Sequence, residues 1–412
     1  RQMPAHWGKK SIRMVTQSSP PGTQYLQAVG MALAAKKEGS DEAVYVSSGE
    51  GATSEGEFFE AVNWAAREAL PVIFFIQDNK LAISVPVAQQ TAGGSVFEAT
   101  KGFSGLQREQ VDGTDFFATY EAMQRAVARA RKGGGPTLLV AHTVRLLPHS
   151  SSDDHAKYRT KEDIDRDKKL DPIPKLTAWL IEQGLLTDPS ANEIVEEVKQ
   201  AVDKAAEWAE SRPVPDASSV MDQLYGDAHA APPGEFVEPQ HDGAKVVLVD
   251  AINHALAEEM ERDAKVVVFG EDVAAGKGGV FAATKGLTAK FGVERCFNSP
   301  LAEASIMGVA IGMSLKGWKP VPEILFGDYI WPAVMQIRDE LAMMRYRSNG
   351  AWSSPVVIRV PVGGYIHGGH YHSQSIDGFF AHIPGIRIAY PSTAADAKGL
   401  LKAAIRDPNP VV

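Results

Sequence analysis

The sequence of 412 residues predicts an α/β protein with two domains, each a mainly parallel sheet with helices on both faces. Short apolar segments such as PVIFFI (71–76) alternate along the chain with amphipathic helical segments, which is the pattern of βαβ units. These apolar segments show no polar alternation, as expected for strands of a parallel sheet buried on both faces. The pattern stops near residue 160 and restarts near residue 243, which predicts one domain on each side of a connector.

The composition is typical of a soluble globular protein and argues against several functions. Charged residues make up 23%, and the net charge of −9 comes without a dense basic stripe, which argues against a nucleic-acid partner. No apolar run approaches the roughly 18 residues that span a bilayer, so we expect no membrane segment. Cys296 is the only cysteine, which favours a reducing, intracellular setting. Because the chain opens on Arg1 and ends in DPNPVV, we expect an internal piece of a longer protein.

The first domain, 1–160, contains one complete βαβ unit. Strands are predicted at 43–49, where AVYVSSG runs into a glycine turn, and at 71–79. Between them, residues 54–70 begin with Ser, Glu and Glu and continue with helical periodicity, which is typical of a helix N-terminus. A single crossover helix makes the strands parallel, so their carboxyl ends meet at one edge of the sheet. Further predicted elements are a helix at 23–37 and a strand at 136–147.

The connector, 161–242, is predicted to be charged and helical up to about residue 211 and proline-rich after it. The second domain, 243–412, again alternates strands and helices. Its predicted elements are strands at 265–272, 320–326 and 355–361 and helices at 304–318 and 393–405.

Glu50 and Asn79 follow the two strands of the βαβ unit and are separated by 29 residues. Ligands of parallel sheets bind beyond the carboxyl ends of the strands, so both side chains are expected at one site. Gly49 and Gly51 let main-chain amides approach an anion, and the positive end of the following helix would point at it. A cation such as Mg²⁺, held by Glu50, Asn79 and the carbonyl of Leu81, would join the carboxylate to phosphate oxygens.

Two other interpretations of the Gly-Glu-Gly turn stay open. By itself, such a turn is more often a surface turn than a site. It could also be an altered dinucleotide-binding motif, although the third glycine is missing. The combination with Asp-Asn at this spacing, and with the intervening βαβ unit, is much more specific than the turn alone.

The segment GEGATSEGEFFEAVNWAAREALPVIFFIQDNKLAIS resembles the thiamine diphosphate motif of the decarboxylating first component of 2-oxo acid dehydrogenase complexes. Most members have aspartate where Glu50 stands, and in this respect the chain resembles the branched-chain 2-oxo acid enzymes. The segments RQMPAHWG, SSPPGTQ and RLLPHSSSDDHAKYR resemble the alpha subunit, whereas VVFGEDVA, FNSPLAEASIMGVAIGMSLKGW and HYHSQS resemble the beta subunit. The resemblance implies two transketolase-like, thiamine diphosphate-binding domains, alpha-like and beta-like, fused in one chain and truncated at both ends.

In the first domain, the resemblance implies roles for particular residues. Glu50, Asn79 and the Leu81 carbonyl match the ligands of magnesium. The positions that match cofactor contacts are Gly49, Gly51, Ala52 and Arg145 at the diphosphate, and Ser19 and Pro21 at the aminopyrimidine. A potassium site described in some members matches Ser18, Pro20, Thr23 and Gln24. His149 matches an active-site histidine of a mobile loop, and Ser150 matches a serine that is phosphorylated in mitochondrial members.

In the second domain, Glu303 matches the glutamate that hydrogen-bonds the aminopyrimidine ring and activates the cofactor. His372 matches a histidine that faces the reacting carbon. Further contacts to the pocket or the pyrimidine are implied for Leu301, Tyr329 and Glu271. Leu325 stands where branched-chain relatives tend to carry glutamine, which is a departure from the pattern.

Each role has a simpler alternative in the residues themselves. Arg145 could pair with Asp153 or Asp154 and order the loop. His149, in a loop rich in serine and aspartate, could be a solvated histidine. Glu303 could serve as a helix cap, since it precedes an apolar helix.

The resemblance implies oxidative decarboxylation of a branched-chain 2-oxo acid of the 3-methyl-2-oxobutanoate type, with acyl transfer to the lipoyl group of a dihydrolipoyl acyltransferase core. In this fold the two domains that hold the cofactor usually come from different copies, so we expect a homodimer. The implied compartment is the cytoplasm for a bacterial chain or the mitochondrial matrix for a eukaryotic one. Three alternatives stay open: a pyruvate or acetoin dehydrogenase component, a transketolase-type transferase and a catalytically inactive truncated scaffold.

Overall fold

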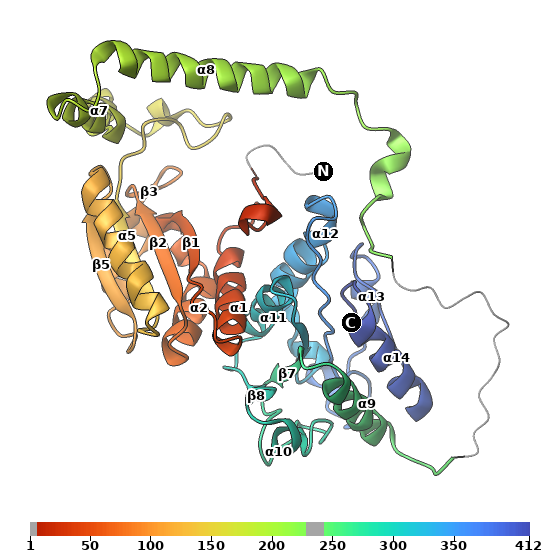
Figure 1. Ribbon diagram of the computed structural model, residues 1–412. Helices are drawn as coiled ribbons and strands as arrows, with labels where there is room; N and C mark the ends of the chain where they lie inside the picture. Colours follow the sequence, from red (N-terminus) through yellow and green to blue (C-terminus); the bar gives the residue numbers. More distant parts are fainter. Residues whose placement is uncertain (1–5, 228–242) are drawn as a thin grey trace.

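The computed structural model describes residues 6–227 and 243–412. It confirms the predicted α/β class, with two mainly parallel sheets flanked by helices. The layers follow one another across the molecule (Figure 1). The first domain contributes an outer helix, its sheet and two inner helices. The second domain then contributes one inner helix, its sheet and two outer helices. The last part of the predicted connector, 228–242, and most of the alpha-like segment at 1–8 lie outside the described residues.

The first sheet has the strand order β1-β2-β6-β5, and all its pairings are parallel. Its strands are β1 (Val44–Gly49), β2 (Val72–Asp78), β5 (Gln107–Asp112) and β6 (Thr137–His142). The strand predicted at 136–147 therefore ends early. Its last paired residue is His142, whose partners Asp78 and Asp112 are the last residues of the two neighbouring strands.

Helices cover both faces of this sheet. α1 (Thr23–Lys37) and α2 (Gly56–Arg67) lie on one face, and α5 (Phe116–Arg131) lies on the other. Because side chains alternate along a strand, Phe74 packs in the core cluster with α1 and α2, while Ile73 faces α5. The short elements between β2 and β5 are β3 (Leu81–Ala82), β4 (Val85–Pro86), α3 (Val87–Gln90) and α4 (Val96–Ala99).

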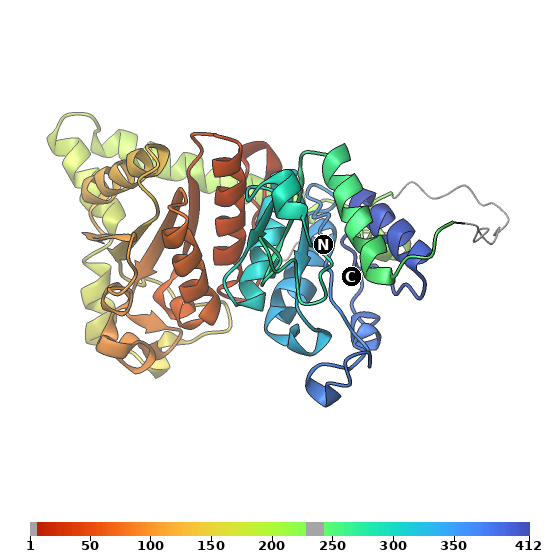
Figure 2. The ribbon, with the colours of Figure 1, turned by 90° about the horizontal axis from the view of Figure 1, so that it is seen from below.

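The second sheet has the parallel strand order β8-β7-β9. Its strands are β7 (Val266–Gly270), β8 (Cys296–Asn298) and β9 (Lys319–Glu323), and its helices are α9 (Leu248–Arg262), α11 (Glu303–Leu315) and α14 (Ala394–Arg406). Val267 belongs to the core cluster that contains α11, and Val268 belongs to a second cluster that contains α9 and α14. α9 and α14 lie side by side in both views (Figures 1 and 2).

The strand predicted at 355–361 is wrong in its extent. The segment makes only isolated bridges, from Arg359 to Glu323 and from Val357 to Val411. Proline at both ends of the segment removes two main-chain donors, which limits strand pairing. The remaining helices of the second domain are α10 (Leu287–Phe291), a π-helix at Gln336–Leu341, α12 (Met344–Arg347) and α13 (Asp377–Phe380).

The two domains meet where α1 packs on α11. A Cβ atom at Gly30 would lie 2.1 Å from the carbonyl oxygen of Val309, and one at Gly312 would lie 2.0 Å from that of Gln27. Only glycine permits such a close approach of two helix backbones. One core cluster therefore runs through both domains.

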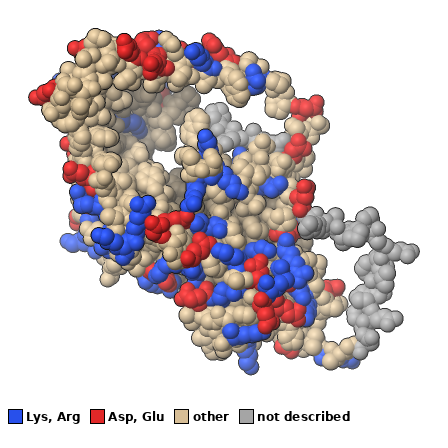
Figure 3. Space-filling view, viewed as in Figure 1, with Lys and Arg blue, Asp and Glu red and all other residues tan. Residues whose placement is uncertain are grey.

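The connector contains α6 (Lys161–Lys168), α7 (Pro172–Glu182), α8 (Asp188–Glu210) and a 3-10 helix at Ala217–Met221. α8 buries no residue and stands apart from the layers (Figures 1 and 3). The connector then returns to the second domain, where the Asn409 amide donates a hydrogen bond of 3.1 Å to the carbonyl of Gly226. Among the helices of the described residues, none combines the length and apolarity needed to cross a membrane.

Candidate functional site

Glu50 and Asn79 lie next to each other at the carboxyl edge of the first sheet. Oε2 of Glu50, the first residue after β1, accepts a hydrogen bond of 3.2 Å from the main-chain N–H of Asn79. Oδ1 of Asn79 in turn accepts one of 3.0 Å from the main-chain N–H of Leu81. The structure thus brings together the three residues that the sequence predicts as metal ligands.

The surroundings of Glu50 fit a metal ligand. Glu50 is 2% exposed, and its Oε1 is buried without a hydrogen-bond partner. Burial raises the pKa of Glu50, and the nearby carboxylate of Asp78 raises it further. A bound cation would compensate the cost of this buried, unpaired oxygen. Oxygen ligands of the three kinds present here, carboxylate, amide and carbonyl, suit Mg²⁺.

The described residues include no group of three or more His, Cys, Asp or Glu side chains that could hold a metal ion. A cation at Glu50 would therefore take its other ligands from Asn79, from main-chain carbonyls and from phosphate or water. This is how Mg²⁺ is usually bound at phosphate sites.

The turn after Glu50 differs from its prediction. It is a 3-10 helix, Glu50–Ser54, and α2 begins only at Gly56, so the helix predicted from residue 54 starts two residues too early. A Cβ atom at Gly51 would lie 2.6 Å from the Cβ of Ala82, which explains why glycine is needed where this turn approaches β3. Diphosphate binding by the main chain of Gly51 and Ala52 stays a prediction.

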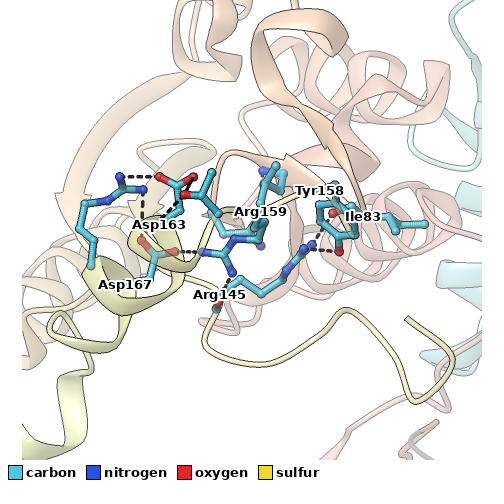
Figure 4. Close-up of polar contacts among 10 residues, drawn as sticks. Ile83, Arg145, Tyr158, Arg159, Asp163 and Asp167 are labelled. Carbon is cyan, nitrogen blue, oxygen red and sulfur yellow. Dashed lines mark hydrogen bonds and ion pairs between the residues drawn. The ribbon is translucent and has the colours of Figure 1, made fainter. Parts of the chain in front are cut away.

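Arg145 connects the loop after β6 to the turn after β3 (Figure 4). Its guanidinium donates hydrogen bonds to the carbonyl of Ile83 at 2.7 Å and to the hydroxyl of Tyr158 at 2.6 Å. The Tyr158 hydroxyl donates to Asp153 at 2.6 Å, so Arg145 reaches this carboxylate through Tyr158 rather than by a direct pair. Nε of Arg145 is buried without a partner. Arg159 donates to the Arg145 carbonyl at 2.8 Å and orders the same stretch.

His149 lies on the exposed part of this loop, where its main-chain N–H donates to Asp153 at 2.9 Å. The hydrogen bond from Tyr158, followed by this one, lowers the pKa of Asp153. The ring of His149 is solvated, as the simpler interpretation expects, and the loop places Ser150 on the surface beside it.

Two predicted acids lie at the carboxyl edge of the second sheet. Glu271 directly follows β7, and Glu303 is the first residue of α11. Burial, and then the neighbouring carboxylate of Glu303, raises the pKa of Glu271 to about 7. The N-cap of α11 is Ala302, and no side chain caps this helix, so helix capping does not account for Glu303.

His372 and Tyr329 are also brought together. The Tyr329 hydroxyl lies 2.9 Å from Nε2 of His372, and the ring of Phe326 packs edge-on against His372 with centroids 4.6 Å apart. Leu301, by contrast, is 80% exposed. Ser19 and Pro21 are exposed as well, with the Ser19 hydroxyl 2.7 Å from Nε2 of His6.

The two groups of predicted residues lie at the same end of the domain contact. Ser305, in the first turn of α11, donates to Glu60 at 2.7 Å, and Gln336 donates to Glu57 at 2.9 Å. Both acids belong to the first two turns of α2, which follows the turn that carries Glu50. The N-terminal ends of α2 and α11, each next to the carboxyl edge of its own sheet, therefore lie close together. Burial, followed by neighbouring glutamates, raises the pKa of Glu57 to about 7.

Glu340 is a candidate that the sequence analysis missed. It is 1% exposed, and its Oε1 accepts hydrogen bonds from the hydroxyls of Thr23, at 2.9 Å, and Ser18. Its Oε2 pairs with Arg347. Two hydroxyls expected to bind potassium thus donate to a carboxylate of the second domain. No local signal in the sequence pointed to Glu340, which stands in the mixed polar and apolar segment QIRDEL.

Two protein-family models match the chain and give the class of protein to which it belongs. Residues 1–218 match the "Dehydrogenase E1 component" model, and residues 244–412 match the "Transketolase, pyrimidine binding domain" model. The chain belongs to the dehydrogenase E1 component family, with an alpha-like region followed by a beta-like region, as predicted. Both families depend on thiamine diphosphate.

Individual relatives resemble one region or the other. The 2-oxoisovalerate dehydrogenase subunit beta of Bacillus subtilis is 57% identical over 164 residues, which cover 40% of this chain and 50% of the relative. The alpha subunit from the same organism is 42% identical over 225 residues, or 55% of this chain and 68% of the relative. The pyruvate dehydrogenase E1 component subunit beta of B. subtilis is 48% identical over 169 residues, or 41% and 52%. The chain spans about half the length of these beta subunits.

Proposed function

We propose that this chain catalyses the oxidative decarboxylation of a branched-chain 2-oxo acid of the 3-methyl-2-oxobutanoate type. The observation that carries the proposal is the juxtaposition of Glu50 and Asn79 at the carboxyl edge of the first sheet, with a buried carboxylate oxygen left unpaired. The relatives named for 2-oxoisovalerate support the branched-chain substrate. The pyruvate relative supports a second candidate, pyruvate.

In this proposal the first domain binds the charged end of the cofactor. Glu50, Asn79 and the Leu81 carbonyl would hold Mg²⁺. The diphosphate would be bound by the main chain of Gly49, Gly51 and Ala52 and by the guanidinium of Arg145. The buried, unpartnered Nε of Arg145 is a donor that an anion could use. The hydroxyls of Ser18 and Thr23 are held by Glu340, and this arrangement supports the adjoining main chain of Ser19 to Pro21 with or without potassium.

The second domain would supply the groups that move protons. Bound thiamine diphosphate provides a carbon nucleophile for the keto group and an electron sink for decarboxylation. Glu303 would share a proton with a nitrogen of the aminopyrimidine ring. Glu271, with its pKa near 7, stays largely protonated below neutral pH and so limits the repulsion between the two acids. His372, oriented by the Tyr329 hydroxyl, would exchange a proton with the substrate.

The acyl group would pass to the lipoyl group of a dihydrolipoyl acyltransferase core, with His149 on an exposed loop. Relatives named as alpha and beta subunits support an assembly with further chains. We expect at least a homodimer, in which the exposed Leu301, Ser19 and Pro21 would be covered. The cytoplasm of a bacterium or the mitochondrial matrix stays the predicted compartment.

Calorimetric titration with thiamine diphosphate and Mg²⁺ tests the proposal. The intact protein should bind saturably, and Glu50→Ala should weaken binding by at least tenfold because a metal ligand is lost. Glu121→Ala is the matched control, since that carboxylate is 68% exposed on the outer helix α5 and should leave binding unchanged. Absence of binding to the intact protein would favour the inactive scaffold.

The substrate is tested by single-turnover decarboxylation of 3-methyl-2-oxobutanoate and pyruvate under identical conditions. A preference for the branched substrate supports the proposal. A preference for pyruvate would contradict the branched-chain proposal and support pyruvate as the substrate.

A further inference from the structure

The turn from Asn79 to Leu81 is supported by polar side chains that the proposed mechanism does not use. Asp78, the last residue of β2, is 1% exposed. Its Oδ1 accepts a hydrogen bond of 3.1 Å from the main-chain N–H of Lys80, and its Oδ2 pairs with the Lys80 ammonium. A buried carboxylate is costly unless it is paired and hydrogen-bonded, so these contacts stabilise the charge at this position.

His142 supports Asp78 from the neighbouring strand. The two residues face each other in the register of β2 and β6, and Nδ1 of His142 lies 3.3 Å from Oδ2 of Asp78. The same Nδ1 lies 3.3 Å from the Lys80 ammonium, which pairs with Asp78, so His142 supports this carboxylate through Lys80. Nε2 of the same ring lies 2.7 Å from Oε1 of Gln110 on β5, which fixes the ring orientation. Side chains from three adjacent strands, β2, β6 and β5, thus stabilise the turn from Asn79 to Leu81.

The support acts where the backbone is strained. Lys80 has a φ of +68°, in the left-handed region that residues other than glycine adopt only at a cost. The Lys80 main-chain N–H donates to the side chain of Asp78, two residues earlier, which is the hydrogen bond of an Asx turn. This bond stabilises the left-handed conformation of Lys80.

The conformation of Lys80 also decides where the predicted metal ligands lie. Asn79 on one side donates to Glu50, and Leu81 on the other side donates to the Asn79 side chain. A change of φ at Lys80 would redirect the main chain from Leu81 onward and break the second of these bonds. The ligand set therefore exists only while this turn is held.

We propose that Asp78, supported by His142, is a positioning residue that holds the Asn79–Leu81 turn and thereby sets the affinity for a divalent cation. This rests on the proposed function for the identity of the ligands. Asp78 and His142 themselves contribute no ligand. Their role resembles the outer contacts of metal sites, whose loss commonly lowers metal affinity roughly 10–100-fold.

The test is a calorimetric titration of the chelator-treated full chain with MgCl₂ at saturating thiamine diphosphate. Asp78→Ala should weaken Mg²⁺ binding by about tenfold. Asp78→Asn keeps the acceptor for the Lys80 N–H and should stay within about threefold of the intact chain. His142→Ala should lie between these variants, and His142→Gln, whose side-chain oxygen can accept from the Lys80 ammonium, should recover most of the loss.

The decisive variant is Asp78→Ala combined with Lys80→Gly. Glycine adopts a positive φ without strain, so the double variant should recover most of the lost affinity. Lys80→Gly alone serves as the background control. Recovery supports a role through the turn, whereas a double variant as weak as Asp78→Ala overturns the inference.

Hydrogen exchange of the metal-free chain gives a readout that does not depend on the cofactor. The amides of Lys80 and Leu81 should exchange faster in Asp78→Ala and at the original rate in Asp78→Asn. Unchanged exchange in Asp78→Ala would overturn the inference. If the intact chain binds no Mg²⁺ with thiamine diphosphate, the proposed function fails, and this exchange experiment still decides whether Asp78 holds the turn.

Discussion

Two carboxylates at the carboxyl edge of the second sheet differ in their surroundings. Glu271 is 8% exposed with a buried, unpartnered Oε1, whereas Glu303 is half-buried at the start of α11. Their mutual repulsion acts on the more buried one, which takes up the proton. A buried carboxyl group whose pKa is raised beside a second acid is typical of functional sites.

Glu271→Gln should change the pH dependence of stability. The pKa of Glu271 is raised from 4.5 to about 7 in the folded chain, so its protonated form stabilises the fold. This contribution is complete below pH 4.5 and is lost as the pH rises through about 7. Between pH 5 and pH 8, the free energy of unfolding of the intact chain should fall by about 2 kcal/mol relative to the variant. Denaturant titrations of both proteins measure this, and parallel pH profiles would contradict it.

Glu303→Gln should separate binding from chemistry. Glutamine is isosteric and keeps a hydrogen-bonding group, so thiamine diphosphate affinity should change by less than about threefold. Decarboxylation of 3-methyl-2-oxobutanoate should fall by about 100-fold or more, because the shared proton is lost. Stopped-flow measurement of CO₂ release at saturating cofactor tests this, and normal turnover would refute the role of Glu303.

At the scale of elements, the contact of α1 with α11 depends on glycines. Gly312→Ala would place a Cβ atom 2.0 Å from the Gln27 carbonyl, so we expect a loss of about 2–3 kcal/mol in the free energy of unfolding. Gly399→Ala is the matched control, because a Cβ atom there meets no atom within 4 Å and helix propensity should stabilise α14 by about 0.5–1 kcal/mol. Thermal melts of both variants would show opposite shifts. Equal shifts would contradict this account of the contact.

Helices and strands with a strong apolar pattern could be predicted from the sequence, whereas elements without one could not. The helix at 23–37 was located to the residue because its apolar positions lie in the core. β5, with the sequence QREQVD, was missed because this edge strand is polar and buries none of its residues. α9 was missed as well, since no element is predicted between residues 243 and 265.

The same limit applies to the site. The approach of Glu50 to Asn79 followed from a local βαβ unit and could be predicted from spacing. The contact of Glu340 with Thr23 joins residues 317 positions apart, and no local pattern encodes it. The support by His142 could not be predicted either, because it depends on the register of β2 and β6.

At the scale of the whole molecule, one core cluster contains residues of both domains. The domains should therefore unfold together, because separating them would expose the apolar surface of α1 and α11. Calorimetry should show one transition for the layered body, with equal van't Hoff and calorimetric enthalpies. Two resolved transitions in the intact chain would contradict this, since either domain would then be stable alone.

The connector, which contacts the second domain through Gly226 and Asn409, has a further consequence. A single round of translation yields both halves in equal number, so neither can accumulate in excess of the other. Tethered halves encounter each other at a local concentration that the connector sets, whatever the abundance of the protein. Assembly of the alpha-like with the beta-like half is therefore insensitive to dilution and to imbalance between two genes.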